Sequence, residues 1–502
     1  MLGALVAAGA MLALTAASAS AANRFASPTG TTAAPCTQAL PCDIVTAVNK
    51  AAGGDNITIE PGTYGPLTTP LSDNGKPLSI HDLAGQPLPV IDTTADYGFD
   101  LSGGSKLSDV VIDDSRASAY GFYAGGPNAS IDHVYVNASG SGAWACYPNA
   151  TMVDSVCWAS GPNGTAVTEL IVASVMGELR NDTLIASGTG GHAIGVFGKG
   201  DATMTIDMTN TIAHGAAADI YATTDTNFGS KAVVNADHSN YASVTEVPGK
   251  GTITITPAGS GTNQDTAPVF ADAAAGNFRE LMGSPTIGAG VDSPVNGSTD
   301  LDGNPREIAG ATDIGAYQFI PGPSCVPQNA STKFGTLAKL QLQCSFVLGG
   351  LLSYVITGGP QHGMASIAAS TGAVTYTPAA GYSGTDSFTY SVTSMSQTTT
   401  TGTVTITVGK EPKPALSHVK HSKGTFSFRL NEAATVTLTF AHHGHAKGTI
   451  KLNGRAGANR LHFTGRLPHR KRLKHGKYTV TIKASNAGGV AKAKPLKFTL
   501  KS

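Results

Sequence analysis

A loose repeat between residues 108 and 215 places the strongest constraint on the fold of this 502-residue chain. Its five copies are S-D-V-V-I-D-D, D-H-V-Y-V-N-A-S-G, D-S-V-C-W-A-S-G, N-D-T-L-I-A-S-G and T-N-T-I-A-H-G, anchored on Asp109, His133, Ser155, Asp182 and Asn210. Successive anchors lie 24, 22, 27 and 28 residues apart. No copy can bury its apolar side chains alone, so the pattern predicts a β-solenoid with a small residue or glycine at each bend. The alternative, a β-sandwich, would need tighter hairpin signals.

The segment before the repeat predicts a covered start to the solenoid. Asp43 is placed to cap a short helix whose apolar residues begin at Ile44 and which ends at a Gly-Gly pair. Asn56 to Glu60 then alternates like a strand and ends at a Pro-Gly turn. We expect the helix to cap the first strand of the stack.

The first 22 residues predict a secretory signal. They form an apolar, alanine-rich run that ends in small residues suited to a signal peptidase, Ala19-Ser20-Ala21. No Lys or Arg precedes the run, and an N-terminal membrane anchor is the alternative. No later stretch approaches the roughly 20 apolar residues that cross a bilayer. We therefore expect an exported protein, extracellular or associated with the cell envelope.

The cysteines fall into three close pairs along the sequence, Cys36 with Cys42, Cys146 with Cys157, and Cys325 with Cys344. An exported chain meets an oxidising environment, which favours disulfides over a metal site. The spacings of 6, 11 and 19 residues also differ from the C-x-x-C pairs typical of zinc. We predict three local disulfides and no bound metal.

Several motifs are typical of a known family. P-G-T-Y-G begins at residue 61 and S-V-C-W-A-S-G at 155, while S-P-T-I-G-A-G, T-D-L-D-G-N-P-R and D-I-G-A-Y-Q-F follow between 284 and 319. Through them, residues 24–320 resemble secreted bacterial right-handed parallel β-helix proteins of the pectate-lyase-like group. The closing motifs resemble those of the choice-of-anchor Q proteins, although Gly288 stands where that pattern has an acid.

The aspartates of the closing motifs follow a calcium-loop template only at its start. Asp300, Asp302 and Asn304 occupy positions 1, 3 and 5, but position 6 is Pro305 and position 12 is Ala311 instead of Gly and Glu. The segment therefore predicts turns rather than a calcium site.

The run D-I-G-A-Y-Q-F that follows alternates like a final strand. We predict that it seals the last rung of the solenoid as a lid. Arg306 is predicted to form a closing ion pair with Asp300 or Asp313.

Two linkers divide the rest of the chain. After P-G-P-S at 321–324, the run V-T-Y-T-P-A-A-G-Y-S-G-T-D-S-F-T-Y-S-V-T resembles bacterial Ig-like, cadherin-like modules, with alternating Val374, Tyr376, Phe388, Tyr390 and Val392. After G-K-E-P-K-P, residues 415–502 resemble small C-terminal β-sandwich modules of actinobacterial exported proteins.

The predicted fold class is all-β, a right-handed parallel β-helix followed by two small Ig-like β-sandwich domains. The predicted parts are a signal peptide (1–22), the β-helix with its cap helix and closing segment (23–320), an Ig-like β-sandwich (325–409) and a basic β-sandwich module (415–502).

The formal net charge of zero hides two halves of opposite sign. From Lys410 onward the chain has 20 Lys and Arg against two acids, Glu411 and Glu432, whereas the rest has 13 bases and 31 acids. The most basic run carries Arg466, Arg470, Lys471, Arg472, Lys474 and Lys477. Export argues against nucleic acid, so we expect cell-wall or other extracellular anionic polymers, held in a salt-sensitive way. A solvated face or a contact with the acidic half is the alternative.

His442, His443 and His445 are expected in a solvated loop because no Cys or carboxylate flanks them.

Parallel β-helices host polysaccharide lyases and hydrolases, which defines candidate catalytic residues. A lyase needs carboxylates to hold calcium against an acidic sugar and a base such as Arg, and I-D-D-S-R supplies Asp113, Asp114 and Arg116. A hydrolase would add a histidine, for which His192 in G-G-H-A is the candidate. The Gly-His-Gly and Arg-x-Lys partners of such enzymes are missing, and aspartate at a bend is more often a turn residue.

Two functional hypotheses follow. The first is a non-enzymatic, monomeric surface protein whose β-helix presents a binding surface for carbohydrate or envelope polymer, with an Ig-like spacer and a basic retention module. The second is a polysaccharide lyase or glycoside hydrolase acting on acidic polysaccharide. No cofactor is expected, with calcium required only by a lyase.

Overall fold

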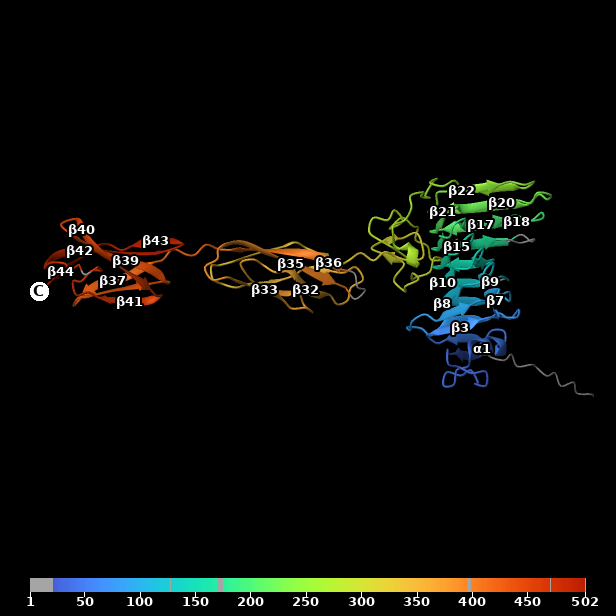
Figure 1. Ribbon diagram of the computed structural model, residues 1–502, viewed down its shortest axis with the longest axis horizontal. Coiled ribbons are helices and arrows are strands. Elements are labelled where there is room, and N and C mark those ends of the chain that lie inside the picture. Colours follow the sequence, from blue (N-terminus) through green and yellow to red (C-terminus); the bar gives the residue numbers. More distant parts are fainter. Residues whose placement is uncertain (1–20, 127, 170–174, 395–398, 470, 502) are drawn as a thin grey trace, which may run out of the picture. The chain divides into compact units, whose positions relative to one another are not determined.

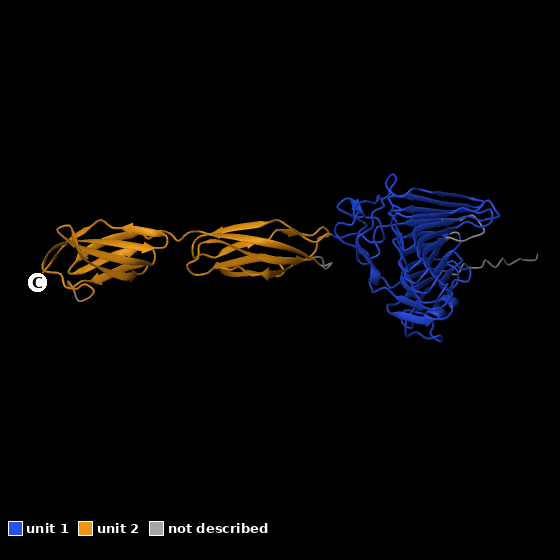
Figure 2. Ribbon diagram, turned by 45° about the horizontal axis from the view of Figure 1, so that its top comes forward, with its two compact units in different colours: residues 1–320 blue, residues 321–502 orange. Residues whose placement is uncertain are grey.

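The computed structural model describes residues 21–126, 128–169, 175–394, 399–469 and 471–501. The chain divides into two compact units, residues 1–320 and 321–502 (Figures 1 and 2). The structure confirms the predicted all-β class, with a parallel β-helix in the first unit and β-sandwiches in the second. Of the predicted signal peptide, residues 1–20 lie outside the described residues. No described helix is both long and apolar enough to cross a membrane.

The β-helix is built from two parallel sheets of 15 and 8 strands. The main path of the larger sheet comprises β1 (Asn23–Ala26), β2 (Asn56–Ile59), β5 (Ser79–Asp82), β8 (Lys106–Asp114), β10 (Ser130–Ala138), β12 (Thr151–Val153), β15 (Val175–Arg180), β18 (Thr203–Thr209), β21 (Lys231–Asp237) and β23 (Thr252–Ile255). Beside this path pair β3 (Thr63–Leu67), β6 (Val90–Thr93), β13 (Val156–Ala159), β16 (Thr183–Ala186) and β19 (Ile212–Gly215). The 8-stranded sheet comprises β4 (Leu71–Ser72), β7 (Tyr97–Leu101), β9 (Tyr120–Ala124), β11 (Trp144–Pro148), β14 (Thr165–Glu169), β17 (His192–Phe197), β20 (Ala218–Thr223) and β22 (Val244–Val247).

Apolar side chains stack in columns through the interior because equivalent residues of successive rungs pair in register. One column from the 8-stranded sheet contains Leu71, Phe99, Phe122, Cys146, Val167, Ile194, Ile220 and Val244. An opposing column contains Ile91, Ile112, Val136, Cys157, Leu184 and Ala213. These columns form one continuous core, which is the stacked burial that the repeat predicts.

A column of polar residues in left-handed backbone conformation forms one bend of the solenoid. Its members and their φ angles are Asp109 (57°), His133 (53°), Asp154 (52°), Asn181 (53°), Asn210 (50°) and His238 (45°). The expectation of a small residue or glycine at each bend is therefore wrong here. Asn, Asp and His tolerate this conformation better than other side chains, and they also supply hydrogen bonds.

Helix α1 (Ile44–Lys50) lies at the N-terminal end of the stack (Figure 1). As predicted, Asp43 caps it, and its carboxylate accepts a hydrogen bond from the Thr46 amide at 2.8 Å. Ile44, Ala47 and Val48 are buried in the same core as the first rungs. The helix therefore protects the apolar end of the first rung from water.

The three predicted disulfides are present: Cys36–Cys42, Cys146–Cys157 and Cys325–Cys344. Cys146 in β11 and Cys157 in β13 belong to opposing core columns, so their bond crosses the interior of the β-helix. No described cysteine is free.

The closing segment, residues 265–320, lies along the flank of the β-helix rather than over its last rung (Figure 1). It contains β24 (Phe270–Asp272), a 3-10 turn η1 (Ala273–Ala275), β25 (Asn277–Glu280), β26 (Glu307–Ile308) and β27 (Ala311–Thr312). A second apolar cluster joins it to outward residues of three successive rungs: Val156, Ile185 and Ile212 pack with Phe278, Leu301, Ile314, Ala316 and Tyr317. The predicted lid on the last rung is therefore wrong, because these outward apolar residues recruit the segment to the side.

The predicted final strand over D-I-G-A-Y-Q-F is also wrong. Residues 313–319 form no strand, and residues 313–318 are all buried. Their backbone bonds instead with the bend residues and their neighbours, since Gly315 N donates to Asn210 O at 2.8 Å and Ala316 N donates to the Thr183 hydroxyl at 2.9 Å. Contacts with the flank thus replace the alternating pattern of a strand.

Arg306 pairs with Asp154 of the bend column rather than with Asp300 or Asp313. Both side chains are buried, and the guanidinium also donates to Gly315 O at 2.9 Å and Ala316 O at 3.2 Å. Asp300 instead holds a turn, accepting hydrogen bonds from the amides of Asp302 and Asn304. Arg306 reaches Asp154, 152 residues earlier in the chain, because the closing segment lies along the flank of the β-helix.

The Ig-like fold of the second unit has a four-stranded, a three-stranded and a two-stranded sheet. Its strands are β28 (Ser324–Cys325), β29 (Gln328–Thr332), β30 (Ala338–Gln341), β31 (Cys344–Ser345), β32 (Ser353–Gly358), β33 (Gly363–Ile367), β34 (Ala373–Pro378), β35 (Gly384–Thr393) and β36 (Thr399–Val408). The alternating residues singled out in the sequence, Val374, Tyr376, Phe388, Tyr390 and Val392, are all buried in its core.

The basic module folds into a three-stranded and a five-stranded sheet. Its strands are β37 (Leu416–Ser422), β38 (Thr425–Leu430), β39 (Ala434–His442), β40 (His445–Gly454), β41 (Gly457–His462), β42 (Gly476–Asn486), β43 (Gly489–Lys492) and β44 (Leu496–Leu500). Its core is rich in phenylalanine, with Phe426, Phe428, Phe440, Phe463 and Phe498 buried. Of the three histidines expected in a solvated loop, only His443 lies in the turn between β39 and β40, whereas His442 ends β39 and His445 begins β40.

Candidate functional site

The outer face of the 8-stranded sheet carries an aromatic platform, defined here as Tyr97, Tyr120, Tyr123, Trp144 and Tyr147. These residues come from β7, β9 and β11 of three successive rungs. Tyr123 and Tyr147 directly follow the inward Phe122 and Cys146, so strand alternation directs them outward. The first-row rings lie two residues before an inward Phe99, Phe122 or Cys146, and the residue between them is small and buried in each strand, so the alternation is locally broken there.

The platform has two rows of rings. In the first, Tyr97, Tyr120 and Trp144 pair in register, with ring centroids 5.1 and 4.8 Å apart and planes within 13° and 15° of parallel. In the second, Tyr123 and Tyr147 are 5.0 Å apart, and Tyr147 also lies 5.7 Å from Tyr120. Such stacked and tilted contacts hold the rings in fixed positions relative to one another.

Beyond Trp144 the first row is interrupted by a small residue. Register places Thr165 of β14 next to Trp144, and His192 of β17 next to Thr165. His192 in turn stacks on Tyr221, with centroids 4.5 Å apart. Among the described residues, the ring face of Trp144 opposite Tyr120 has no aromatic neighbour. Two aromatic groups thus flank the position of Thr165, which is itself buried.

Charged groups border the platform at its Tyr97 end. Asp96 and Arg116 form a surface ion pair at 2.7 Å, and Asp100 precedes the buried Leu101 in β7. Burial raises the pKa of Tyr97, with a further increase from Asp100. Burial also raises the pKa of Tyr120, so both phenols are neutral near pH 7 and can donate and accept hydrogen bonds.

The sequence contains a signal for the platform that the repeat analysis missed. The runs D-Y-G-F-D, A-Y-G-F-Y and A-W-A-C-Y place an outward aromatic residue at 97, 120 and 144, steps of one rung. The alignment of the repeat used the bend residues, which lie on another part of each rung. A second alignment on the aromatic residues would have revealed the row.

The catalytic candidates Asp113, Asp114 and Arg116 lie at or just after the end of β8. The Asp114 side chain points inward, is buried and accepts a hydrogen bond from the Arg116 amide at 3.0 Å. Burial raises its pKa to about 6, and burial also raises the pKa of Asp113, which faces outward beside Asn137. The Arg116 side chain pairs with Asp96. Asp114 therefore has the role of a turn residue.

His192, the fourth candidate, belongs to a different face. It begins β17 in the 8-stranded sheet, whereas Asp113 and Asp114 end a strand of the 15-stranded sheet. Burial lowers the pKa of His192, so its imidazole is neutral near pH 7 and its ring is available for stacking. The fold places it two strands from Trp144, beyond Thr165.

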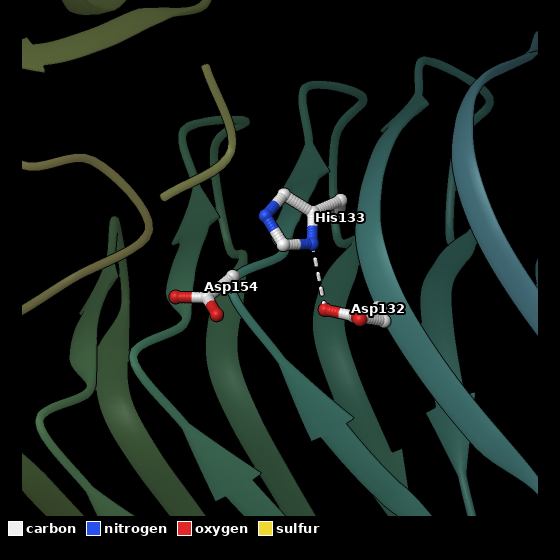
Figure 3. A group of neighbouring side chains, drawn as sticks. All are labelled: Asp132, His133 and Asp154. Atoms are coloured by element: carbon white, nitrogen blue, oxygen red, sulfur yellow. Dashed lines mark hydrogen bonds and ion pairs between the residues drawn. The ribbon is translucent and has the colours of Figure 1, made fainter. Parts of the chain in front are cut away.

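Asp132, His133 and Asp154 form a group with ligand-like spacing, since their ligand atoms lie within 4.8 Å of one another (Figure 3). His133 Nδ1 is 2.7 Å from Asp132 Oδ1, and Nε2 is 3.2 Å from the Thr299 hydroxyl. The Asp132 hydrogen bond raises the pKa of His133 to about 9 against the effect of burial. Arg306 also pairs with Asp154, and Asp132 is exposed, so the group joins a buried ion pair to a surface one.

A hollow of about 420 Å³ lies between the flank of the β-helix and the closing segment. Val111 and Tyr135 line one side, and Arg279 and Tyr317 the other. Its polar groups already engage one another: Arg279 forms an ion pair with Asp302 and lies 4.6 Å over the Tyr317 ring, and Tyr135 donates to Gly276 O at 2.9 Å. This arrangement stabilises the closing segment.

The predicted basic patch lies in the loop between β41 and β42, apart from Lys477, which belongs to β42. Leu467 and Leu473 are buried and hold the loop on the core, while Arg466, Lys471, Arg472, Lys474 and Lys477 are exposed. Arg470 lies outside the described residues. No described residue from 410 to 501 forms an ion pair, so these cations face solvent without a carboxylate partner.

Comparison with known proteins defines one domain by family. Residues 325–407 match the bacterial Ig domain family, and no curated protein matches the chain. A solved pectate lyase, Pel9A, shares 13% identity with a TM-score of 0.30, covering 60% of this chain and 96% of its own. An endo-fucoidan hydrolase of glycoside hydrolase family 107 shares 15% identity with a TM-score of 0.20, covering 35% and 28% of the two chains. A protocadherin gammaB7 fragment shares 12% identity with a TM-score of 0.20, covering 36% and 47%.

Proposed function

We propose that this chain is an exported, non-enzymatic carbohydrate-binding protein. Its β-helix holds sugar rings against the aromatic platform, its Ig-like domain acts as a spacer, and its basic module retains the protein near the cell envelope. The observation that carries the proposal is the row of Tyr97, Tyr120 and Trp144, stacked in register on an outer face and each partly exposed.

The chemistry of a sugar matches this surface. A pyranose ring presents apolar C–H groups on its faces and hydroxyl groups around its rim, so it packs against an aromatic face and hydrogen-bonds at its edge. Clustered partly exposed rings are also a mark of interaction surfaces on soluble proteins. Asp96, Asp100 and the tyrosine hydroxyls supply partners for the rim.

The exposed parts of the row give the proposal a position. Thr165, which pairs with Trp144 in register, is buried with 4% of its surface exposed and offers no surface to a sugar. We place the sugar rings on the partly exposed surfaces of Trp144, Tyr120 and Tyr97, one rung apart along the platform.

Binding of polysaccharides tests this function. Pull-down with a panel of insoluble neutral and acidic polysaccharides is expected to retain the wild-type protein on at least one of them. Trp144→Ala and Tyr97→Ala are each expected to weaken that binding about tenfold or more. The matched control is Phe228→Ala, an exposed ring of the same β-helix outside the platform. Wild-type protein that binds none of the panel, or variants that bind like wild type, would contradict the proposal.

An assay with polygalacturonate and calcium tests the enzymatic alternative. The non-enzymatic proposal expects no increase in the ultraviolet absorbance of unsaturated uronates. Product that forms with the wild type and disappears in Asp113→Asn would instead establish a lyase and overturn the first hypothesis.

A further inference from the structure

Asp132, His133 and Asp154 bring two carboxylates and an imidazole together at one bend of the β-helix (Figure 3). Asp132 and His133 are adjacent in β10, and Asp154 is the bend residue of the next rung. Among the described residues, these three form the one group of His, Cys, Asp or Glu side chains whose ligand atoms all lie this close together, within 4.8 Å. The expectation of no bound metal followed from the cysteines, and this group contains none.

One oxygen of Asp154 has no partner in the described part of the chain. Oδ1 accepts a hydrogen bond from Asn181 Nδ2 of the following rung at 3.2 Å and pairs with Arg306. Oδ2 makes no hydrogen bond, although the side chain is fully buried. Because Asn181 and Arg306 engage Oδ1, Oδ2 faces His133 and Asp132 of the preceding rung (Figure 3). A buried carboxylate oxygen without a partner is unfavourable, and a cation beside it would compensate its charge.

The closing segment passes over this oxygen without a side chain. A Cβ atom at residue 297 would lie 2.7 Å from Asp154 Oδ2, and Gly297 has a φ of 79°, which other residues rarely adopt. Two residues later, the Thr299 hydroxyl lies 3.2 Å from His133 Nε2. When Nε2 carries the hydrogen and donates it to Thr299, the lone pair of a neutral imidazole is on Nδ1, the nitrogen beside the carboxylates.

We infer that this group binds a divalent transition-metal ion of the zinc type through the Asp132 carboxylate, His133 Nδ1 and Asp154 Oδ2. An imidazole nitrogen with carboxylate oxygens is a ligand set that Zn²⁺ accepts, whereas Ca²⁺ takes oxygen ligands. Metal–ligand distances of about 2.1 Å place the ligand atoms no more than about 4.2 Å apart, so small side-chain rotations close the group around an ion. This metal site goes beyond the proposed carbohydrate binding and does not depend on it.

The surroundings of the group fit the charge and the entry of such an ion. His133 Nδ1 lies 2.7 Å from Asp132 Oδ1 and donates a hydrogen to it, because an ionised carboxylate only accepts. The ion takes the place of this proton, which leaves to solvent. The Asp132 side chain is 52% exposed, so the ion can enter from that side and keep water as a further ligand. Arg306 stays on Asp154 Oδ1 and orients the carboxylate.

Calorimetric titration of the full-length protein with Zn²⁺, after removal of metal by a chelator, tests this site. A tight equivalent of Zn²⁺ is expected for the wild type, with much weaker binding of Ca²⁺. Asp132→Asn changes an exposed residue and is expected to weaken Zn²⁺ binding about tenfold or more. A wild type that binds no Zn²⁺, an Asp132→Asn variant that binds like wild type, or equal binding of Ca²⁺ would each overturn the site.

The same bend column supplies a matched control. Asp237 and His238 repeat the Asp-His pair, with Nδ1 2.9 Å from Asp237 Oδ1 and a φ of 45° at His238. In the described part of the chain, no third ligand residue joins this pair. Asparagine suits the bend, as Asn181 shows, so His133→Asn is expected to abolish the tight equivalent and His238→Asn to keep it. Equal effects of the two variants would overturn the assignment to His133.

The other possible source of zinc binding is the cluster of His442, His443 and His445 in the second unit. Their triple change to asparagine is expected to keep the tight equivalent, and its loss there would assign the ion to those histidines instead.

Stability gives a second readout, because His133 and Asp154 both contact the closing segment. Zn²⁺ is expected to raise the urea midpoint of the wild type but not that of His133→Asn. The same rise in both proteins would contradict the site.

Discussion

The flank of the β-helix and the outer face of its 8-stranded sheet use outward side chains in opposite ways. On the flank, the bend residues Asp154, Asn181 and Asn210 are buried beneath the closing segment and bond to it. On the 8-stranded sheet, Tyr120 and Trp144 stack on each other and stay partly exposed. The buried charged residues therefore hold the closing segment, while the proposed binding surface consists of partly exposed rings. Removal of a side chain is expected to cost stability on the flank and binding on the platform.

The largest effect is expected from Arg306→Met. This substitution leaves Asp154 buried without its cation, which costs about 3–5 kcal/mol of unfolding free energy. Urea unfolding can be followed through Trp158, whose ring lies 5.7 Å from Phe278 of the closing segment, in a Trp144→Phe background. Arg279→Met removes a surface ion pair with Asp302 and is the control, with an expected cost of about 1 kcal/mol. Equal losses in the two variants would show that the buried pair has no special weight.

Glu280 is expected to make the stability of the closing segment depend on pH. Burial raises the pKa of Glu280 from 4.5 to about 7. Between these values the folded state keeps a proton that the unfolded state has released, so the unfolding free energy falls as pH rises, by up to roughly 3 kcal/mol. Glu280→Gln keeps a neutral group of similar shape and is expected to flatten this fall. Urea unfolding at pH 5 and pH 8 measures it, and parallel profiles for variant and wild type would contradict the assignment.

Asn181→Gly is expected to cost about 2 kcal/mol, because it removes three hydrogen bonds of the bend column. The Asn181 amide donates to Asp154 and to Asn296 O, and its carbonyl oxygen accepts from Asn210 at 2.9 Å. Glycine keeps the left-handed backbone at φ 53°. Asn181→Ala is expected to cost about 1–2 kcal/mol more, because alanine disfavours that conformation. If alanine and glycine had the same cost in urea unfolding, backbone conformation would not explain the choice of asparagine.

These regions also differ in how far sequence alone could predict them. The stacked rungs and inward columns follow from local alternation and rung spacing, so residues such as Val134 and Val136 could be assigned to the core. The disulfides followed from proximity in sequence and the expected export. Arg306 with Asp154 could not be predicted, because 152 residues separate them and the contact depends on where the closing segment docks. The closing motifs identify this segment in the sequence, but they do not show which surface of the β-helix it packs against.

The aromatic platform was not predicted from the sequence, for a different reason. Its signal is local, since aromatic residues at 97, 120 and 144 recur at the rung step. Outward position, however, depends on strand register, which the bend-based alignment left unspecified.

The smallest effect on stability is expected on the platform, where Tyr120→Ala tests the comparison directly. Tyr120 contacts the rings of Tyr97, Trp144 and Tyr147, but it does not belong to the core cluster that contains Phe122. Loss of these three ring contacts is expected to cost about 1.5 kcal/mol in urea unfolding, at about 0.5 kcal/mol for each pair of partly exposed rings. Binding of the polysaccharide retained by the wild type is expected to fall about tenfold, because Trp144 loses the ring that orients it.

Tryptophan fluorescence can separate the two effects in one sample. The protein has two tryptophans, and Trp158→Phe leaves Trp144 as the reporter of the platform. In that background, Tyr120→Ala should change the emission of Trp144 and its response to added oligosaccharide while the unfolding midpoint moves little. A large loss of stability without a change in affinity would place the platform rings with the flank residues, as parts of the fold, and the contrast between the two faces would no longer hold.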